Sequence, residues 1–147
     1  MNHEKHMRLA IEAAKNNPAS PFGAVIVDGE SGEVLATAFN EGHRNPVRHG
    51  ETAAIYDLAE KNPDVEWSRL TLYTTAEPCP MCAGAILWAG IPRVVIGTSA
   101  ETLKKLGVLR TEIPIHEVVS RSSFGEVDIT SGVLKGECDA LYEAVVG

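Results

Sequence analysis

Apolar positions along the first 40 residues predict one helix followed by two strands. The apolar side chains of segment 4–15 share one helical face: Met7, Ala10, Ile11 and Ala14. The Asn-Asn-Pro sequence at 16–18 ends this pattern. Segments 23–28 and 33–39 favour strands, and the Gly-Glu-Ser-Gly sequence between them indicates a hairpin turn. We therefore expect two antiparallel strands directly after the first helix.

The rest of the chain alternates between helical and strand patterns. The expected helices and strands, in order, are helix 49–60, strand 70–74, helix 80–88, strand 93–97, helix 101–106, strand 127–129 and helix 135–145. A strand, a helix and a second strand of these lengths imply a parallel crossover. Together the elements predict an α/β fold, a three-layer α/β/α sandwich with a mixed sheet of about five strands. We expect residues 1–147 to form a single domain, because the length suits one core.

Composition limits the partners and the cellular location that we expect for the chain. The net charge is −7, so the chain lacks the overall basic character of proteins that bind phosphate backbones, and nucleic acid is disfavoured as a partner. No segment has the apolar length of a membrane span or the apolar core of a signal peptide. Three cysteines cannot all pair within one chain. We therefore expect a cytoplasmic protein whose closely spaced cysteines bind a metal or do redox chemistry.

Two short motifs carry the candidate chemistry, and both fall where a polar loop becomes a helix. The first contains His49 and Glu51, and the second contains Cys79 and Cys82. Cysteines three residues apart at a helix start point to the same side, where the helix dipole favours their thiolates. Two thiolates and one imidazole make three ligands, the pattern of a catalytic zinc whose fourth position holds water. The sequence predicts one zinc ion per subunit.

Glu51 follows His49 by two residues, so it does not share the ligand direction but lies close enough to reach water at the zinc. A carboxylate in this position can accept a proton from that water and return it to a substrate. We therefore assign Glu51 as the catalytic acid and base. The expected reaction is attack of the activated water on a ring carbon that bears an amine, followed by loss of ammonia.

The combination H-x-E followed by P-C-x-x-C resembles the cytidine deaminase-like superfamily, and the likeness spans nearly the whole chain. It is similar in particular to the branch of cytosine, guanine and tRNA adenosine deaminases. The resemblance implies the ligand set and the acid/base residue named above, a homodimer, and Asn40 as a side chain that binds the substrate. We add three further residues to the expected substrate contacts: Phe22, Trp88 and His43.

Three of these four substrate residues have a plainer alternative. Asn40 ends a strand, where asparagine is often only a turn former. Trp88 lies at helical spacing from Gly84 and Ala85, so packing in the core accounts for it as well as a pocket wall does. His43 is by default a surface histidine, although it lies close enough to Asn40 in sequence to line the pocket mouth.

Three functions compete for the chain. The leading one is deamination of a small heterocycle, a free nucleobase of the cytosine or guanine type or a close analogue. The second is conversion of adenosine to inosine in tRNA, against which the acidic charge counts. The third is a zinc-stabilised module without catalysis, which leaves the open coordination position and Glu51 unexplained.

Overall fold

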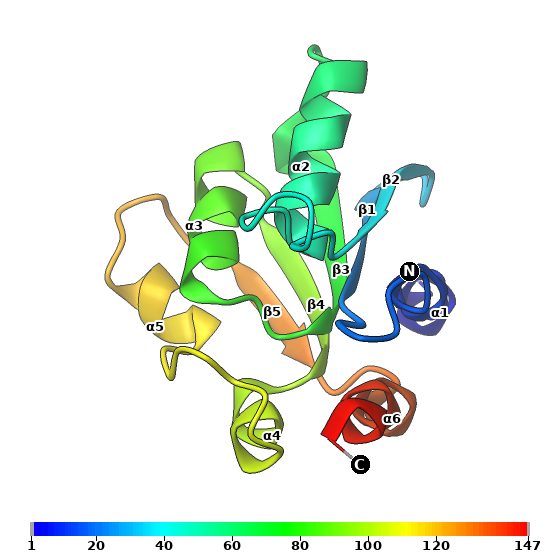
Figure 1. Cartoon of the computed structure of the whole chain (residues 1–147). Coiled ribbons are helices and arrows are strands. Elements are labelled where there is room, and N and C mark those ends of the chain that lie inside the picture. The colour runs from blue at the N-terminus through cyan, green and yellow to red at the C-terminus, as the bar shows by residue number, and fades with distance from the viewer. Residues whose placement is uncertain (1, 147) are drawn as a thin grey trace.

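The computed structural model describes residues 2–146, which build one five-stranded sheet with helices on both faces (Figure 1). The helices and strands, in chain order, are α1 (His3–Ala14), β1 (Gly23–Asp28), β2 (Val34–Phe39), α2 (Gly50–Lys61), η1 (Trp67–Arg69), β3 (Leu70–Ala76), α3 (Pro80–Ala89), β4 (Arg93–Thr98), α4 (Ala100–Lys105), α5 (Ile115–Ser120), β5 (Asp128–Ser131) and α6 (Lys135–Val146). The predicted α/β fold class, with its mixed sheet between helix layers, is confirmed.

The sheet has the strand order β2-β1-β3-β4-β5. Strand β1 pairs antiparallel with both β2 and β3, as expected for the hairpin that opens the chain. Strands β3, β4 and β5 run parallel, so the predicted crossover through α3 is confirmed. Parallel neighbours bring the carboxyl ends of β3 and β4 to the same edge of the sheet, and the connections that follow these strands begin there.

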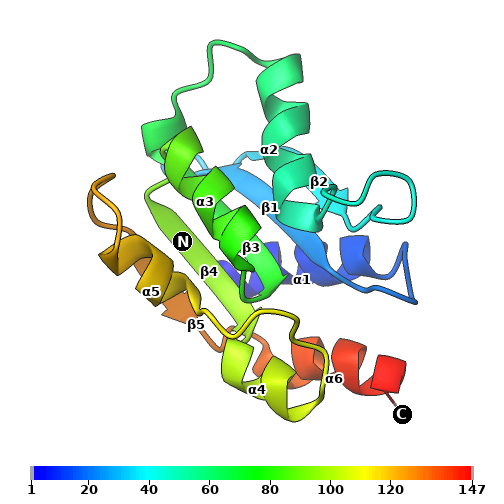
Figure 2. The same cartoon turned by 60° about the vertical axis from the view of Figure 1, so that its left-hand side comes forward.

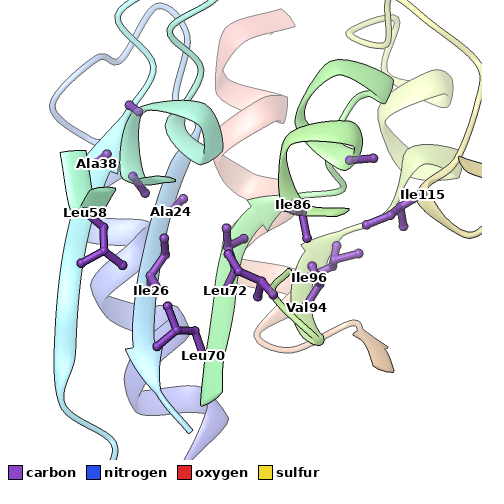
Figure 3. Close-up of a cluster of buried hydrophobic side chains, with 14 residues drawn as sticks. Ala24, Ile26, Ala38, Leu58, Leu70, Leu72, Ile86, Val94, Ile96 and Ile115 are labelled. Carbon is purple, nitrogen blue, oxygen red and sulfur yellow. The ribbon is translucent and has the colours of Figure 1, made fainter. Parts of the chain in front are cut away.

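Alternation along β1 explains how both faces of the sheet are covered. Ala24 and Ile26 face the layer of α2, α3 and α5, whereas Val25 and Val27 face α1 and α6. All four side chains are fully buried. Figure 3 shows the first of these two cores, in which Ile86 of α3 lies over side chains from the strands. Burial of both faces agrees with the nearly continuous apolar sequence of this strand.

The sequence did not predict α5 or the short turn η1. Ile115, Val118 and Val119 are β-branched and favour strands when taken alone. In the structure these residues pack against the core beneath α3, and Pro114 stands at the helix N-cap. Tertiary packing therefore decides the conformation of this segment.

Gly23 allows α1 to lie directly on β1. An ideal Cβ at residue 23 would collide with the carbonyl oxygen of Ala10 and lie 2.7 Å from the nitrogen of Ala14. Gly23→Ala is therefore expected to lower the free energy of unfolding by about 1–3 kcal/mol, since helix backbone must shift. Gly84→Ala is the control, because nothing lies within 4 Å of its added Cβ. Urea unfolding measures both, and equal stability of the two variants would contradict the close contact.

No helix among residues 2–146 combines the length and the apolar character that crossing a membrane requires.

Candidate active site

The two predicted motifs begin two neighbouring helices. His49 is the N-cap of α2, and Cys79 is the N-cap of α3. The backbone N–H of His49 donates to Oγ1 of Thr52 (2.9 Å), which fixes the start of α2. Pro80 occupies the first position of α3, where its missing N–H costs no helical hydrogen bond. Figure 2 shows α2 and α3 on the same face of the sheet.

Three ligand atoms converge between these helix starts. The Nδ1 atom of His49 lies 3.6 Å from the Sγ atoms of both Cys79 and Cys82. All three atoms lie within 4.8 Å of one another, and no fourth His, Cys, Asp or Glu joins them among residues 2–146. Two sulfur ligands and one imidazole suit zinc, and three protein ligands leave one position of a tetrahedral ion open. The three residues predicted as zinc ligands are thus placed together to hold a metal ion.

Each of the two cysteines shifts the pKa of the other. A hydrogen bond from Cys82, together with His49, lowers the pKa of the Cys79 thiol to about 4. The same hydrogen bond and burial raise the pKa of Cys82. The hydrogen bond to Cys79 also raises the pKa of His49. Zinc ligation needs both cysteines as thiolates, and the raised pKa of Cys82 means that metal binding releases a proton.

Glu51 lies in the first turn of α2 and is 5% exposed. Burial raises the pKa of its carboxyl group to about 7, while its own backbone N–H and the neighbouring Thr74 on β3 act in the opposite direction. A carboxyl group with a pKa near neutrality can both accept and return a proton at working pH. Sequence reasoning did not find Thr74, because only the fold brings β3 beside α2.

Burial of Glu51 makes the metal-free protein sensitive to pH. Because the folded pKa of about 7 exceeds the ordinary value of 4.5, the contribution of Glu51 to stability is complete below pH 4.5 and falls as pH rises through 7. At about 1.4 kcal/mol per pKa unit, the loss reaches about 3 kcal/mol above pH 8. Metal-free Glu51→Gln is expected to escape this loss. Urea unfolding of the wild type and of Glu51→Gln at pH 4.5 and pH 8 measures the loss. An equal fall in the free energy of unfolding of both proteins would contradict the role of Glu51.

Two of the predicted substrate residues lie next to this cluster. The backbone N–H of Asn40 donates to the carbonyl of Phe22 (2.9 Å). An ideal Cβ on Gly50, between His49 and Glu51, would lie 3.1 Å from the same carbonyl. The Oδ1 atom of Asn40 accepts from the N–H of Gly42 (2.8 Å), so the asparagine does form a turn. Its amide nitrogen has no partner among the described residues.

No contact with the ligand cluster is recorded among residues 2–146 for the other two predicted residues. Trp88 is 80% exposed, so packing in the core is excluded for it, and its ring lies edge-on to Phe124 at 4.8 Å between centroids. It occupies the end of α3, about 13 Å along the helix axis from Cys79. His43 is exposed in the loop between β2 and α2. Neither residue is brought together with the ligands in this chain.

Comparisons with known proteins agree with this geometry. Residues 1–98 match the family model of the cytidine and deoxycytidylate deaminase zinc-binding region. The chain belongs to this deaminase family. It is therefore a hydrolase with a zinc-binding deaminase domain, as the motifs predicted.

The relatives of this deaminase act on different substrates. A probable cytosine deaminase of Schizosaccharomyces pombe is 35% identical over 82% of this chain and 75% of its own. A tRNA-specific adenosine deaminase of Haemophilus influenzae is 34% identical over 92% and 78%. A guanine deaminase of Bacillus subtilis is 36% identical over 69% and 67%. A solved structure in complex with 2,6-diaminopurine is 26% identical, with a TM-score of 0.82 over 99% of this chain and 83% of the other.

Proposed function

We propose that this deaminase acts on a small heterocycle, a free nucleobase of the cytosine or guanine type or a close analogue. The observation that carries the proposal is the buried carboxyl group of Glu51 beside the three convergent zinc ligands. Zinc, when bound, activates a water molecule as a nucleophile at neutral pH. The amine-bearing ring carbon of the substrate is the expected site of attack.

Glu51 moves the protons of the proposed reaction. Its carboxylate accepts a proton from the attacking water and returns it to a ring nitrogen of the substrate. Glu51 then transfers the second proton of the added water to the amine, which leaves as ammonia. Overall, one water molecule is consumed and one ammonia molecule is released. The raised pKa of Glu51 suits both directions of transfer. His49, Cys79 and Cys82 act only as ligands in this proposal.

Asn40 and Phe22 are proposed to hold the heterocycle. The amide nitrogen of Asn40 has no partner among the described residues and can donate to a ring carbonyl. The ring of Phe22 packs on Tyr142 at 4.9 Å between centroids, which fixes its orientation. A fixed aromatic ring can lie against one face of a planar base. His43 is proposed to stand at the mouth of the site.

Charge near the site favours a small substrate over tRNA. Arg44 donates to Glu41 (3.1 Å), and Arg48 donates to Glu41 (3.0 Å) and to Asp57 (2.8 Å). Acidic partners therefore neutralise both arginines of the loop that leads into α2. Phosphate binding needs cations that are not already paired. Conversion of adenosine in tRNA, the activity for which the 34% identical relative of Haemophilus influenzae is named, is the alternative.

A homodimer is also part of the proposal. The neighbouring helices α2 and α3 carry exposed apolar side chains, namely Tyr56 on α2 and Met81 and Trp88 on α3. Exposed apolar side chains on adjacent elements are typical of subunit interfaces. In such a dimer, Trp88 of one subunit can contribute only to the active site of the other subunit. Sedimentation of the wild type and of Trp88→Glu tests this, with a dimer expected for the first and a monomer for the second.

The test of the substrate is ammonia release by the zinc-loaded protein. Cytosine, guanine, adenine, their nucleosides and related triazines are supplied one at a time, and tRNA is assayed separately for inosine. Release from one free base would support the proposal. Activity on tRNA alone would replace it with the alternative. None of the three cysteines forms a disulfide in the structure, in keeping with the proposed cytoplasmic location.

A further inference from the structure

One carboxylate joins three segments at the edge of the site. Glu77 follows β3 and precedes Cys79 by two residues. Its Oε1 atom accepts from the N–H of Ala100 and its Oε2 atom from the N–H of Ile115, both at 2.9 Å. The N–H of Glu77 donates to the carbonyl of Thr98 (2.8 Å). Ala100 and Ile115 are the first residues of α4 and α5, so Glu77 holds the start of α4 and the point at which the loop between these helices enters α5.

This loop, residues 106–114, contributes apolar side chains to a cluster that also contains Phe22. Leu106, Val108 and Leu109 pack with Phe22 around a buried cluster of Ala76, Leu103 and Tyr142. Ala76 directly precedes Glu77, and the carbonyl of Phe22 lies against Gly50. Figure 2 shows the loop crossing the end of the molecule at which α3 begins. The cluster therefore adjoins both motifs that supply the zinc ligands.

The other backbone hydrogen bonds of the loop are local: the backbone N–H groups of Gly107, Val108 and Leu109 donate to carbonyls of α4, and none of these bonds ties the loop to β3. The helices that flank it have six residues each, which is too short for independent stability. Val108 and Leu109 are only half-buried. The ion pair within the loop region, between Lys104 and Glu112, joins two exposed side chains and contributes little. Charge-assisted hydrogen bonds from two helix N-termini to one carboxylate are stronger than such contacts.

We propose that Glu77 is a positioning residue that sets an apolar wall of Phe22, Val108 and Leu109 against the bound heterocycle. The inference rests on the proposed function, because the wall has a role only if a base binds beside the zinc ligands. An apolar wall offers no hydrogen bond to an exocyclic group, so it selects a substrate by shape. Glu77 thereby determines substrate affinity without touching the substrate.

Glu77→Gln is the test, because it keeps the size of the side chain and removes one of its two acceptors. One of the two amide N–H groups then faces an NH₂ group. We expect KM to rise roughly tenfold, with kcat and zinc content within about twofold of wild type. Hydrogen exchange of the amides of residues 106–114 should become faster. Glu112→Gln is the matched control in the same loop, for which KM and exchange should stay unchanged.

Other outcomes overturn the inference. Loss of zinc or of kcat with unchanged KM would mean that Glu77 acts on the ligand segment and not on the wall. Unchanged KM and unchanged exchange would mean that it positions nothing. If Glu77→Gln does not fold, Leu109→Ala tests the wall directly, and KM must rise while zinc is retained. If the wild type deaminates none of the compounds, the proposed function fails, and exchange in 106–114 still decides whether Glu77 fixes the loop.

Discussion

Glu51→Gln is expected to lower kcat by about 10²- to 10⁴-fold while the zinc content stays at the wild-type level. Glutamine has the shape of glutamate but cannot carry a proton between water and a ring nitrogen. Glu51 is not among the three ligand residues, and its pKa of about 7 fits proton transfer. The measurement is ammonia release on the substrate found for the wild type, together with metal analysis of the same sample.

The matched control for Glu51→Gln is Glu60→Gln, which changes an exposed carboxylate on the same helix. It is expected to keep full activity, because Glu60 lies at the far end of α2. Two results would count against the assignment of Glu51. Normal turnover in Glu51→Gln would mean that another group moves the proton, and loss of zinc would mean that Glu51 helps to hold the metal.

Local signals in the sequence were sufficient for the zinc ligands. His49 and Cys79 each stand at the boundary between a polar loop and a helical pattern, and both are helix N-caps in the structure. Cys82 follows at a spacing that fixes its direction relative to Cys79 once the helix is given. The strand-helix-strand pattern placed the second motif after β3. The periodicity of apolar residues, the position of polar loops and the spacing of the motif residues are all local properties. Together they predicted the zinc chemistry and the fold class.

Contacts between distant segments could not be predicted in this way. Glu77 binds residues 23 and 38 positions away, and neither partner carries a side-chain signal because both donate backbone N–H groups. Trp88 fits a core position by spacing, yet its side of α3 faces outward. Tyr142 reaches from the last helix to the hydroxyl of Thr75 on β3 (2.7 Å). Such pairings depend on how the layers pack, which periodicity does not specify.

Cys82→Ala is expected to weaken zinc binding by more than about 100-fold, since even residues that only support a ligand cost 10–100-fold when changed. Cys82 is fully buried, and its Sγ atom lies 3.6 Å from Nδ1 of His49. The thiolate neutralises charge on the ion, and alanine leaves only two protein ligands. Zinc per chain after dialysis should fall toward zero, and deamination should disappear with it.

Cys138→Ala is the matched control, because Cys138 is equally buried but lies on α6 outside the ligand cluster. Burial raises the pKa of its thiol to about 12, so it stays protonated and unsuited to metal binding. Its replacement should leave the zinc content unchanged, although the core loses a small apolar group. Stoichiometric zinc in Cys82→Ala would contradict the three-ligand site, because two ligands and water do not hold the ion through dialysis. Loss of zinc in both variants would instead trace the effect to the stability of the fold and not to coordination.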